Sequence, residues 1–289
     1  MEYCVYSDES YITAERFRSI TAFSFPVKYH DRIQNIINEI LDSSNVEELK
    51  WQKIRNAKNK FCAEKLINFI FQNIFLYNIR IDAIIWDTQD SRHTILGRDD
   101  DANFERMFFH LIKNLMLKRG KNSIWNIYPD EKLNINWATI YDCLQNMGKK
   151  QDYFVDMFGK EFSDQYYKIE NFREIISAEE PCSQVADFFA GLAVFSKNQY
   201  SDFTIWTSQN SPQLDFFEEN TSVNFSNSQK CRFKILQMFI EYCQRFKMGV
   251  SLNSGKCLNT PNPKNPINFW NYTPQHEDDK APRRENIKE

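Results

Sequence analysis

The segment 181–195, with the sequence PCSQVADFFAGLAVF, constrains the fold more than any other part of the chain. Its residues are apolar or small on every side, and a helix that is hydrophobic all round belongs in the interior of a protein. Asp187 nevertheless stands in the middle of this segment. Burying an ionised carboxylate without a partner costs several kcal/mol at least. The fold must therefore supply Asp187 with a cationic partner, a proton or a metal ion.

Helical spacing adds detail to this segment. Gln184, Asp187, Ala190 and Gly191 fall on one stripe of a helix, which pairs two polar side chains with two small residues. We interpret the small residues as room for a ligand beside Asp187. A structural salt bridge to Asp187 is the competing interpretation, and the helix alone does not separate the two.

The remaining periodicity predicts an α/β protein. Alternating residues at 2–7 and 19–26 indicate an opening β-hairpin, and further strands are expected at 77–86, 123–128 and 167–176. Apolar residues recur at helical spacing in 30–41, 59–75, 104–115, 137–147 and 230–246. We therefore expect a mixed sheet flanked by helices.

Composition favours one large domain with an appended tail. The chain has 289 residues, of which 42% are apolar and 15% aromatic, enough for a sizeable core. We expect the domain to span 1–250, with a long polar insertion at 197–228 that lacks clear periodicity. The Pro- and Asn-rich tail at 251–289 should dock through its aromatic cluster of Phe269, Trp270 and Tyr272.

Several classes of protein are disfavoured. The seven cysteines are odd in number and scattered, which fits reduced thiols, and the four histidines (His30, His93, His110 and His276) lack zinc-ligand spacing. No apolar run reaches the roughly 18 residues of a transmembrane helix, and no signal segment opens the chain, so we expect a cytoplasmic protein with no membrane partner. The net charge of -3 leaves only local patches, such as the lysines and arginine between Lys50 and Lys60, to contact phosphate or form a solvated face.

Three other acids stand where strands or helices begin or end. Asp8 closes the first predicted strand, Glu48 precedes the second helix and Asp130 follows a later strand. Each alone is an ordinary turn or surface acid. Together with Asp187 they form the serial pattern of ribonuclease H-like sites, in which two divalent ions roughly 3.5–4 Å apart clamp a phosphodiester. Hard oxygen ligands suit Mg²⁺ or Mn²⁺, and Glu9 or Asp87 could replace one of the four acids.

Short motifs resemble a known family across nearly the whole chain. They are YSDES at 6–10, ELKW at 48–51, DEK at 130–132, QVADFFAG at 184–191 and the tail NPINFWNYTPQHEDDKAPR at 265–283. In this order they resemble the family catalogued as domain of unknown function 3800. The resemblance implies a ribonuclease H-like fold and a nuclease site at Asp8, Glu48, Asp130 and Asp187. Tyr11 departs from the family pattern, which usually has Gly after DES, so the turn beside Asp8 is expected to differ or to use Tyr11 for stacking on a base.

Two functional hypotheses follow. In the first, Asp8, Asp130 and Asp187 hold Mg²⁺ or Mn²⁺ for hydrolysis of DNA or RNA, and Glu48 ligates or positions water. Lys50 and Gln184 then contact the substrate, with Lys50 steadying a phosphate. In the second, the protein is a catalytically silent ribonuclease H-like module that binds nucleic acid or a partner protein, within a system such as bacterial phage defence. Metal-dependent cleavage of DNA and RNA separates the two.

Overall fold

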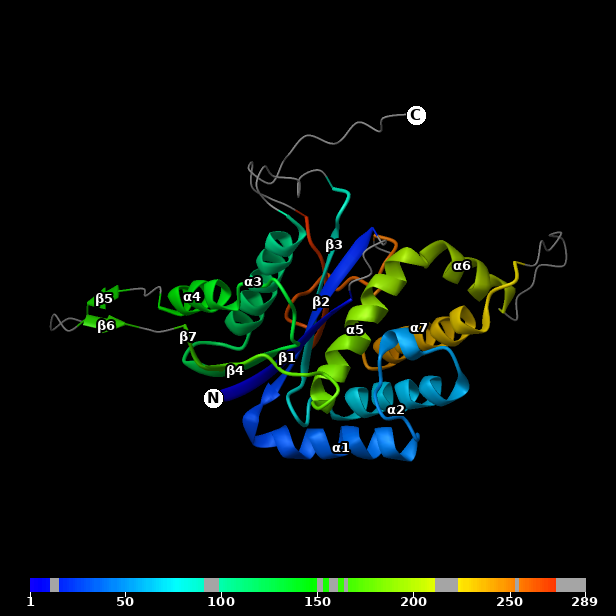
Figure 1. Cartoon of the computed structure of the whole chain (residues 1–289), viewed down its shortest axis with the longest axis horizontal. Coiled ribbons are helices and arrows are strands. Elements are labelled where there is room, and N and C mark those ends of the chain that lie inside the picture. The colour runs from blue at the N-terminus through cyan, green and yellow to red at the C-terminus, as the bar shows by residue number, and fades with distance from the viewer. Residues whose placement is uncertain are drawn as a thin grey trace.

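A six-stranded mixed sheet lies at the centre of the protein (Figure 1). The computed structural model describes residues 1–10, 16–90, 99–149, 153–155, 161–163, 166–210, 223–252 and 255–273. The sheet order is β7-β4-β1-β2-β3-β8. Its strands are β1 (Glu2–Ser10), β2 (Phe17–Pro26), β3 (Arg80–Asp87), β4 (Ser123–Pro129), β7 (Tyr167–Phe172) and β8 (Ile267–Asn271).

The strand directions confirm a mixed α/β sheet opened by a hairpin. β2 runs antiparallel to both β1 and β3, whereas the pairs β1–β4, β4–β7 and β3–β8 are parallel. A separate two-stranded sheet pairs β5 (Tyr153–Val155) with β6 (Glu161–Ser163). It lies away from the main sheet, beyond α4 (Figure 1).

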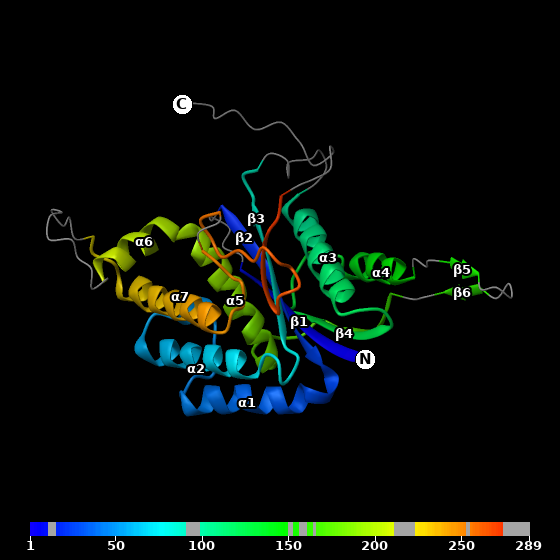
Figure 2. The ribbon, with the colours of Figure 1, turned by 180° about the vertical axis from the view of Figure 1, so that it is seen from behind.

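Helices cover both faces of the sheet (Figures 1 and 2). One face packs against α1 (His30–Ser43), α2 (Ala57–Asn73), α5 (Pro181–Asn198), α6 (Tyr200–Gln209) and α7 (Asn227–Arg245). The other face packs against α3 (Asp100–Lys118) and α4 (Trp137–Gly148). Two short 3-10 turns, η1 (Val27–Tyr29) and η2 (Trp51–Lys53), lie in the connections of the first face. We refer to these two surfaces as the α5 face and the α3 face.

The helix α5 is as buried as its sequence predicts. It packs directly on β1 and β2, with α2 and α7 lying outside it. From Pro181 to Ser196 every residue is buried except Asp187, which keeps partial exposure. Asp187 is therefore the one residue between Pro181 and Ser196 that is partly exposed to solvent.

Two segments differ from a simple domain-plus-tail division. Residues 200–209, expected to belong to an irregular insertion, form α6, because Phe203 and Trp206 bury their rings against Phe233 of α7. The rest of that insertion from 211 to 222, the turn at Tyr11 and the tail beyond 273 lie outside the described residues. The aromatic segment of the tail forms β8 and is thus part of the sheet itself.

Other features agree with the composition. All seven cysteines are free, and five of them are buried. Among the helices of the described ranges, none combines the length and the apolar character needed to cross a bilayer.

Candidate functional site

Asp8 and Asp130 are neighbours on adjacent parallel strands. β1 pairs with β4 in a register that places Ser7 opposite Pro129, so the next residue on each strand is an acid. The Asp130 N–H donates to the Ser7 carbonyl at 2.9 Å and extends the ladder by one step. Asp8 shares the α5 face with Cys4 and Tyr6, since alternate residues of a strand point the same way. The strand ends therefore bring together the first two of the predicted acids.

Asp187 approaches the same place from α5. The negative charges of Asp187 and Asp130 both act on Asp8, whose side chain is only 6% exposed. Three of the four predicted acids thus converge from β1, from the end of β4 and from the helix that lies across β1.

The fourth acid reaches the group through an extended segment, residues 48–51, which we call the strap. Its main chain is held on α5 by two hydrogen bonds: Leu49 N–H donates to Gln184 Oε1 at 2.8 Å, and Trp51 N–H donates to Asp187 Oδ2 at 2.7 Å. Leu49 and Trp51 are buried, and they alternate along the strap with Glu48 and Lys50, which are partly exposed. The strap therefore presents one acid and one base beside Asp187.

Gln184 has a different place from the one its sequence suggests. Its side chain is 2% exposed, and its amide oxygen is engaged by the strap. The Gln184 side chain is therefore not exposed for the expected substrate contact, and its amide oxygen instead holds the strap in position.

The small residues of the α5 stripe let other parts of the protein approach the helix closely. A Cβ added at Gly191 would lie 2.1 Å from Cγ of Trp51, so only glycine lets the indole pack against the helix. The Ala190 carbonyl accepts a hydrogen bond from the Ser19 hydroxyl of β2 at 2.7 Å. Trp51 therefore occupies the space directly over Gly191, and a cavity lined by both residues remains open on this side of α5.

Burial and mutual repulsion disturb the titration of all three aspartates. Burial raises the pKa of Asp8 well above its usual value, and the charges of Asp187 and Asp130 add to the effect. Burial also raises the pKa of Asp187, to about 6, although the Trp51 N–H and Lys50 act in the opposite direction. The pKa of Asp130 is raised by burial and by Glu9. In the metal-free protein the ionised form of each of these carboxylates is therefore disfavoured, mainly by burial and further by neighbouring acids.

Main-chain donors fix one oxygen of each carboxylate. Glu9 N–H donates to Asp8 Oδ1 at 2.7 Å, and Ser177 N–H donates to Asp130 Oδ1 at 3.0 Å, as Trp51 N–H does to Asp187. None of the three aspartates forms an ion pair with a residue in the described ranges. Sequence inspection missed Ser177 and the strap amides, because backbone donors leave no trace in residue type.

Glu48 differs from the three aspartates because it has cationic partners. Its carboxylate binds Lys50 at 3.1 Å and Lys53 at 2.5 Å. Partial burial raises the pKa of Glu48, but the hydrogen bonds from the two lysines lower it below its usual value overall. The Lys50 ammonium also interacts electrostatically with Asp187, Asp8 and Asp130, so this one cation acts on the whole group.

The alternative acids lie elsewhere. Glu9 follows Asp8 on the strand and points to the α3 face, where it is paired with Lys132, whose ammonium also lies over the Phe104 ring. Asp87 is paired with Arg16 at 2.7 Å. Asp8 is level with Thr21 of β2 and with Ala83 of β3, so Asp87 lies four residues farther along β3. Asp87 is thus remote from the three aspartates, whereas Glu9 lies close enough for its charge to act on Asp8 and Asp130 from the other face of the sheet.

The group is open as it stands. Within the part of the chain that the structure describes, no three His, Cys, Asp or Glu side chains are gathered tightly enough to enclose a metal ion. The donor set still fits a hard divalent cation, since it consists of carboxylates in a poorly solvated place with unbalanced charge. Asp8, Asp130 and Asp187 are the residues that would hold such an ion, with Glu48 beside them.

Fold and site together define an α/β protein with an acidic centre where the end of a central strand meets a buried helix. No family model matches the sequence. Two relatives from Methanothermobacter thermautotrophicus, "Uncharacterized protein ORF2'" and "Uncharacterized protein ORF2", are 37% and 36% identical over 287 residues. The alignments cover 96% of this chain and 97% of each relative. The chain therefore belongs to the family of these ORF2 proteins.

Proposed function

We propose that the protein is a nuclease with a ribonuclease H-like fold that hydrolyses phosphodiester bonds with Mg²⁺ or Mn²⁺. One observation carries the proposal: Asp8, Asp130 and Asp187 converge from three elements in a place where burial raises the pKa of each. A protein gains nothing in stability from assembling buried like charges, whereas a divalent cation would relieve their repulsion. The mixed sheet opened by a hairpin and the resemblance to the domain of unknown function 3800 family support the same conclusion.

The residues of the centre divide the work by their positions. Asp8, Asp130 and Asp187 hold the ion, each oriented by a main-chain N–H. Glu48 ligates or positions a water once it leaves its lysines, and Lys50 then neutralises a substrate phosphate. A bound Mg²⁺ or Mn²⁺ supplies charge stabilisation and a water of lowered pKa.

Cleavage of labelled DNA and RNA oligonucleotides with Mg²⁺ or Mn²⁺ tests the proposal. Asp8→Asn should abolish cleavage, and it should also remove the metal-induced stabilisation, which is about 2.7 kcal/mol at ~100 times the dissociation constant. Glu48→Gln should reduce cleavage, whereas Glu47→Gln, which changes the exposed neighbouring acid, should not. Wild-type protein that neither cleaves nor gains stability with either metal would refute the proposal.

A second function is favoured by one specific contact pair. Lys50 and Lys53 already neutralise Glu48, so part of the centre is balanced by the protein's own cations. A catalytically silent module that binds nucleic acid or a partner protein would have this property. Tight nucleic-acid binding without cleavage under either metal would support this second function.

A further inference from the structure

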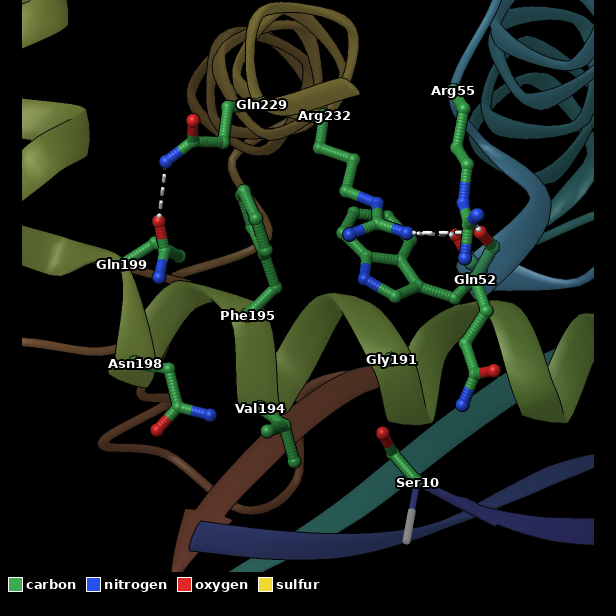
Figure 3. Close-up of a pocket in the computed structure, with 11 residues that line it drawn as sticks. Ser10, Gln52, Arg55, Gly191, Val194, Phe195, Asn198, Gln199, Gln229 and Arg232 are labelled. Carbon is green, nitrogen blue, oxygen red and sulfur yellow. Dashed lines mark hydrogen bonds between the residues drawn. The ribbon is translucent and has the colours of Figure 1, made fainter. Parts of the chain in front are cut away.

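A cavity adjoins the acidic centre on the α5 face. It has a volume of about 280 Å³ and is enclosed by α5, the beginning of α7, the end of β1 and residues 51–55 (Figure 3). Ser10 lines it two residues beyond Asp8, and Gly191 lines it one helical turn beyond Asp187. Two strand residues span roughly 7 Å and one helical turn spans about 5 Å. The cavity is therefore about one nucleotide away from the acids.

The lining of the cavity has opposite charge to the centre. Arg55 and Arg232 both line it, and none of its described lining residues is acidic. Arg232 is held rigidly: its guanidinium lies over the Trp51 ring at 5.8 Å and donates to the Gln52 carbonyl at 3.0 Å. Arg55 is exposed, and its Nε donates to the same carbonyl at 2.9 Å. Two guanidinium groups beside an acidic centre suit an anionic ligand that extends past that centre.

The rest of the lining suits a planar polar group. Four amide side chains, each with donors and an acceptor, line the cavity together with Val194 and Phe195, and Gln229 Nε2 donates to Gln199 Oε1 at 3.3 Å. Figure 3 shows these amides approaching from α5, from α7 and from the strap side. The amides are Gln52, Asn198, Gln199 and Gln229. Amide groups beside apolar side chains can bind the edges of a nucleobase, while arginines bind the adjoining phosphate.

We propose that this cavity binds one unpaired nucleotide of a single-stranded nucleic acid whose neighbouring phosphodiester lies at the acidic centre. The inference rests on the proposed nuclease function and names its substrate class. Strandedness follows from the size, because a volume of about 280 Å³ is on the scale of one nucleotide rather than of a base pair.

Charge reversal at two nearby positions tests the proposal. Arg55 lines the cavity, whereas Lys58, three residues later and equally exposed, does not. Binding of fluorescein-labelled oligothymidylate and oligouridylate of about 12 nucleotides is measured by anisotropy in EDTA at physiological salt. Arg55→Glu should weaken binding about tenfold, and Lys58→Glu should weaken it less than about twofold. Gln52→Glu, an isosteric change on an exposed side chain, should act in the same direction as Arg55→Glu.

The same variants separate failure of this inference from failure of the nuclease proposal. The Mn²⁺-induced rise in melting temperature should be the same in wild type, Arg55→Glu and Lys58→Glu, because neither residue belongs to the acidic centre. Equal effects of the two charge reversals, equal affinity for a matched duplex, or no binding by the wild type would overturn the nucleotide site. Binding that depends on Arg55 but is accompanied by no cleavage would leave this site in place and refute the nuclease.

Discussion

Each face of the sheet carries a buried aspartate, and the pKa of the aspartate is shifted in opposite directions on the two faces. On the α3 face, Asp82 of β3 is 1% exposed and binds Arg80 at 2.6 Å and Lys118 at 2.9 Å. Asn268 of β8 donates to the same carboxylate at 2.8 Å. Burial raises the pKa of Asp82, but the charges of Arg80 and Lys118 lower it below its usual value overall. On the α5 face, burial raises the pKa of Asp8, and the neighbouring acids raise it further.

The difference lies in the partners, since the two side chains are almost equally buried. Asp82 is surrounded by cations and an amide, and it joins β3, α3 and β8. Asp8 is surrounded by other acids, and only main-chain donors and the more distant Lys50 oppose its charge. The sign of the pKa shift therefore separates a buried carboxylate that the protein pairs with cations from one that it does not.

Removing the charge of Asp82 should have the largest effect on stability. Asp82→Asn leaves Arg80 and Lys118 without their counter-charge in a buried place, which costs about 3–5 kcal/mol. Asp87→Asn on the same strand breaks only the solvent-exposed pair with Arg16 and should cost at most about 1 kcal/mol. Chemical denaturation of both variants measures this contrast. Equal losses would show that the Asp82 cluster does not support the fold.

Filling the space at Gly191 should have an intermediate effect. In Gly191→Ala the new methyl group overlaps the Trp51 ring, and overpacking of this kind costs about 1–3 kcal/mol. Because Trp51 N–H holds Asp187, the displaced ring should also disturb the acidic centre. In a Trp51→Gly background, which removes the Cβ, Cγ and Cδ1 atoms that the new methyl group would meet, the same substitution should cost less, and a double-mutant cycle of denaturation measures the coupling. Strict additivity would mean that the ring and the glycine act separately.

Neutralising Asp187 should have the smallest effect on the metal-free protein, with the opposite sign. Asp187→Asn keeps an acceptor for Trp51 N–H and removes one of the repelling charges, so stability at neutral pH should stay equal or rise by about 1 kcal/mol. Cleavage and metal-induced stabilisation should both disappear. A sharp loss of stability in the metal-free variant would instead assign Asp187 a structural role like that of Asp82.

The pH dependence of the same variant sharpens the test. The pKa of Asp187 rises from 3.8 to about 6 on folding, so the folded protein binds a proton more tightly than the unfolded chain between these values. The stability contributed by the protonated form is complete below about pH 4 and is lost as the pH rises through 6. Wild type should therefore lose stability relative to Asp187→Asn across this window, by about 1 kcal/mol. Parallel pH profiles would contradict the shifted pKa.

Local sequence patterns were sufficient for most elements and for the acids themselves. The hairpin, the buried helix carrying Asp187, the acid near the end of β1 and the acid after β4 all follow from periodicity and from charge at element ends. The contacts of the strap could not be predicted, because Trp51 and Asp187 are 136 positions apart and meet through a backbone N–H. Asp82 escaped notice for a similar reason: Lys118 and Asn268 lie far away in sequence. The only local signal was the pair Arg80 and Asp82 at strand spacing in an apolar strand.

The position of β8 has a consequence for how the chain is made. β3 is finished by residue 87, but its outer edge is paired only by residues 267–271. Because synthesis proceeds from the N-terminus, the ribosome adds about 180 further residues before that edge can close. Throughout this interval the nascent chain presents an unpaired strand, the kind of edge on which aggregation begins. Over the same period Asp82 lacks its Asn268 donor, and Arg80 lacks the Pro263 and Lys264 carbonyls as acceptors, so the late segment both closes the sheet and completes the hydrogen bonds of this buried cluster.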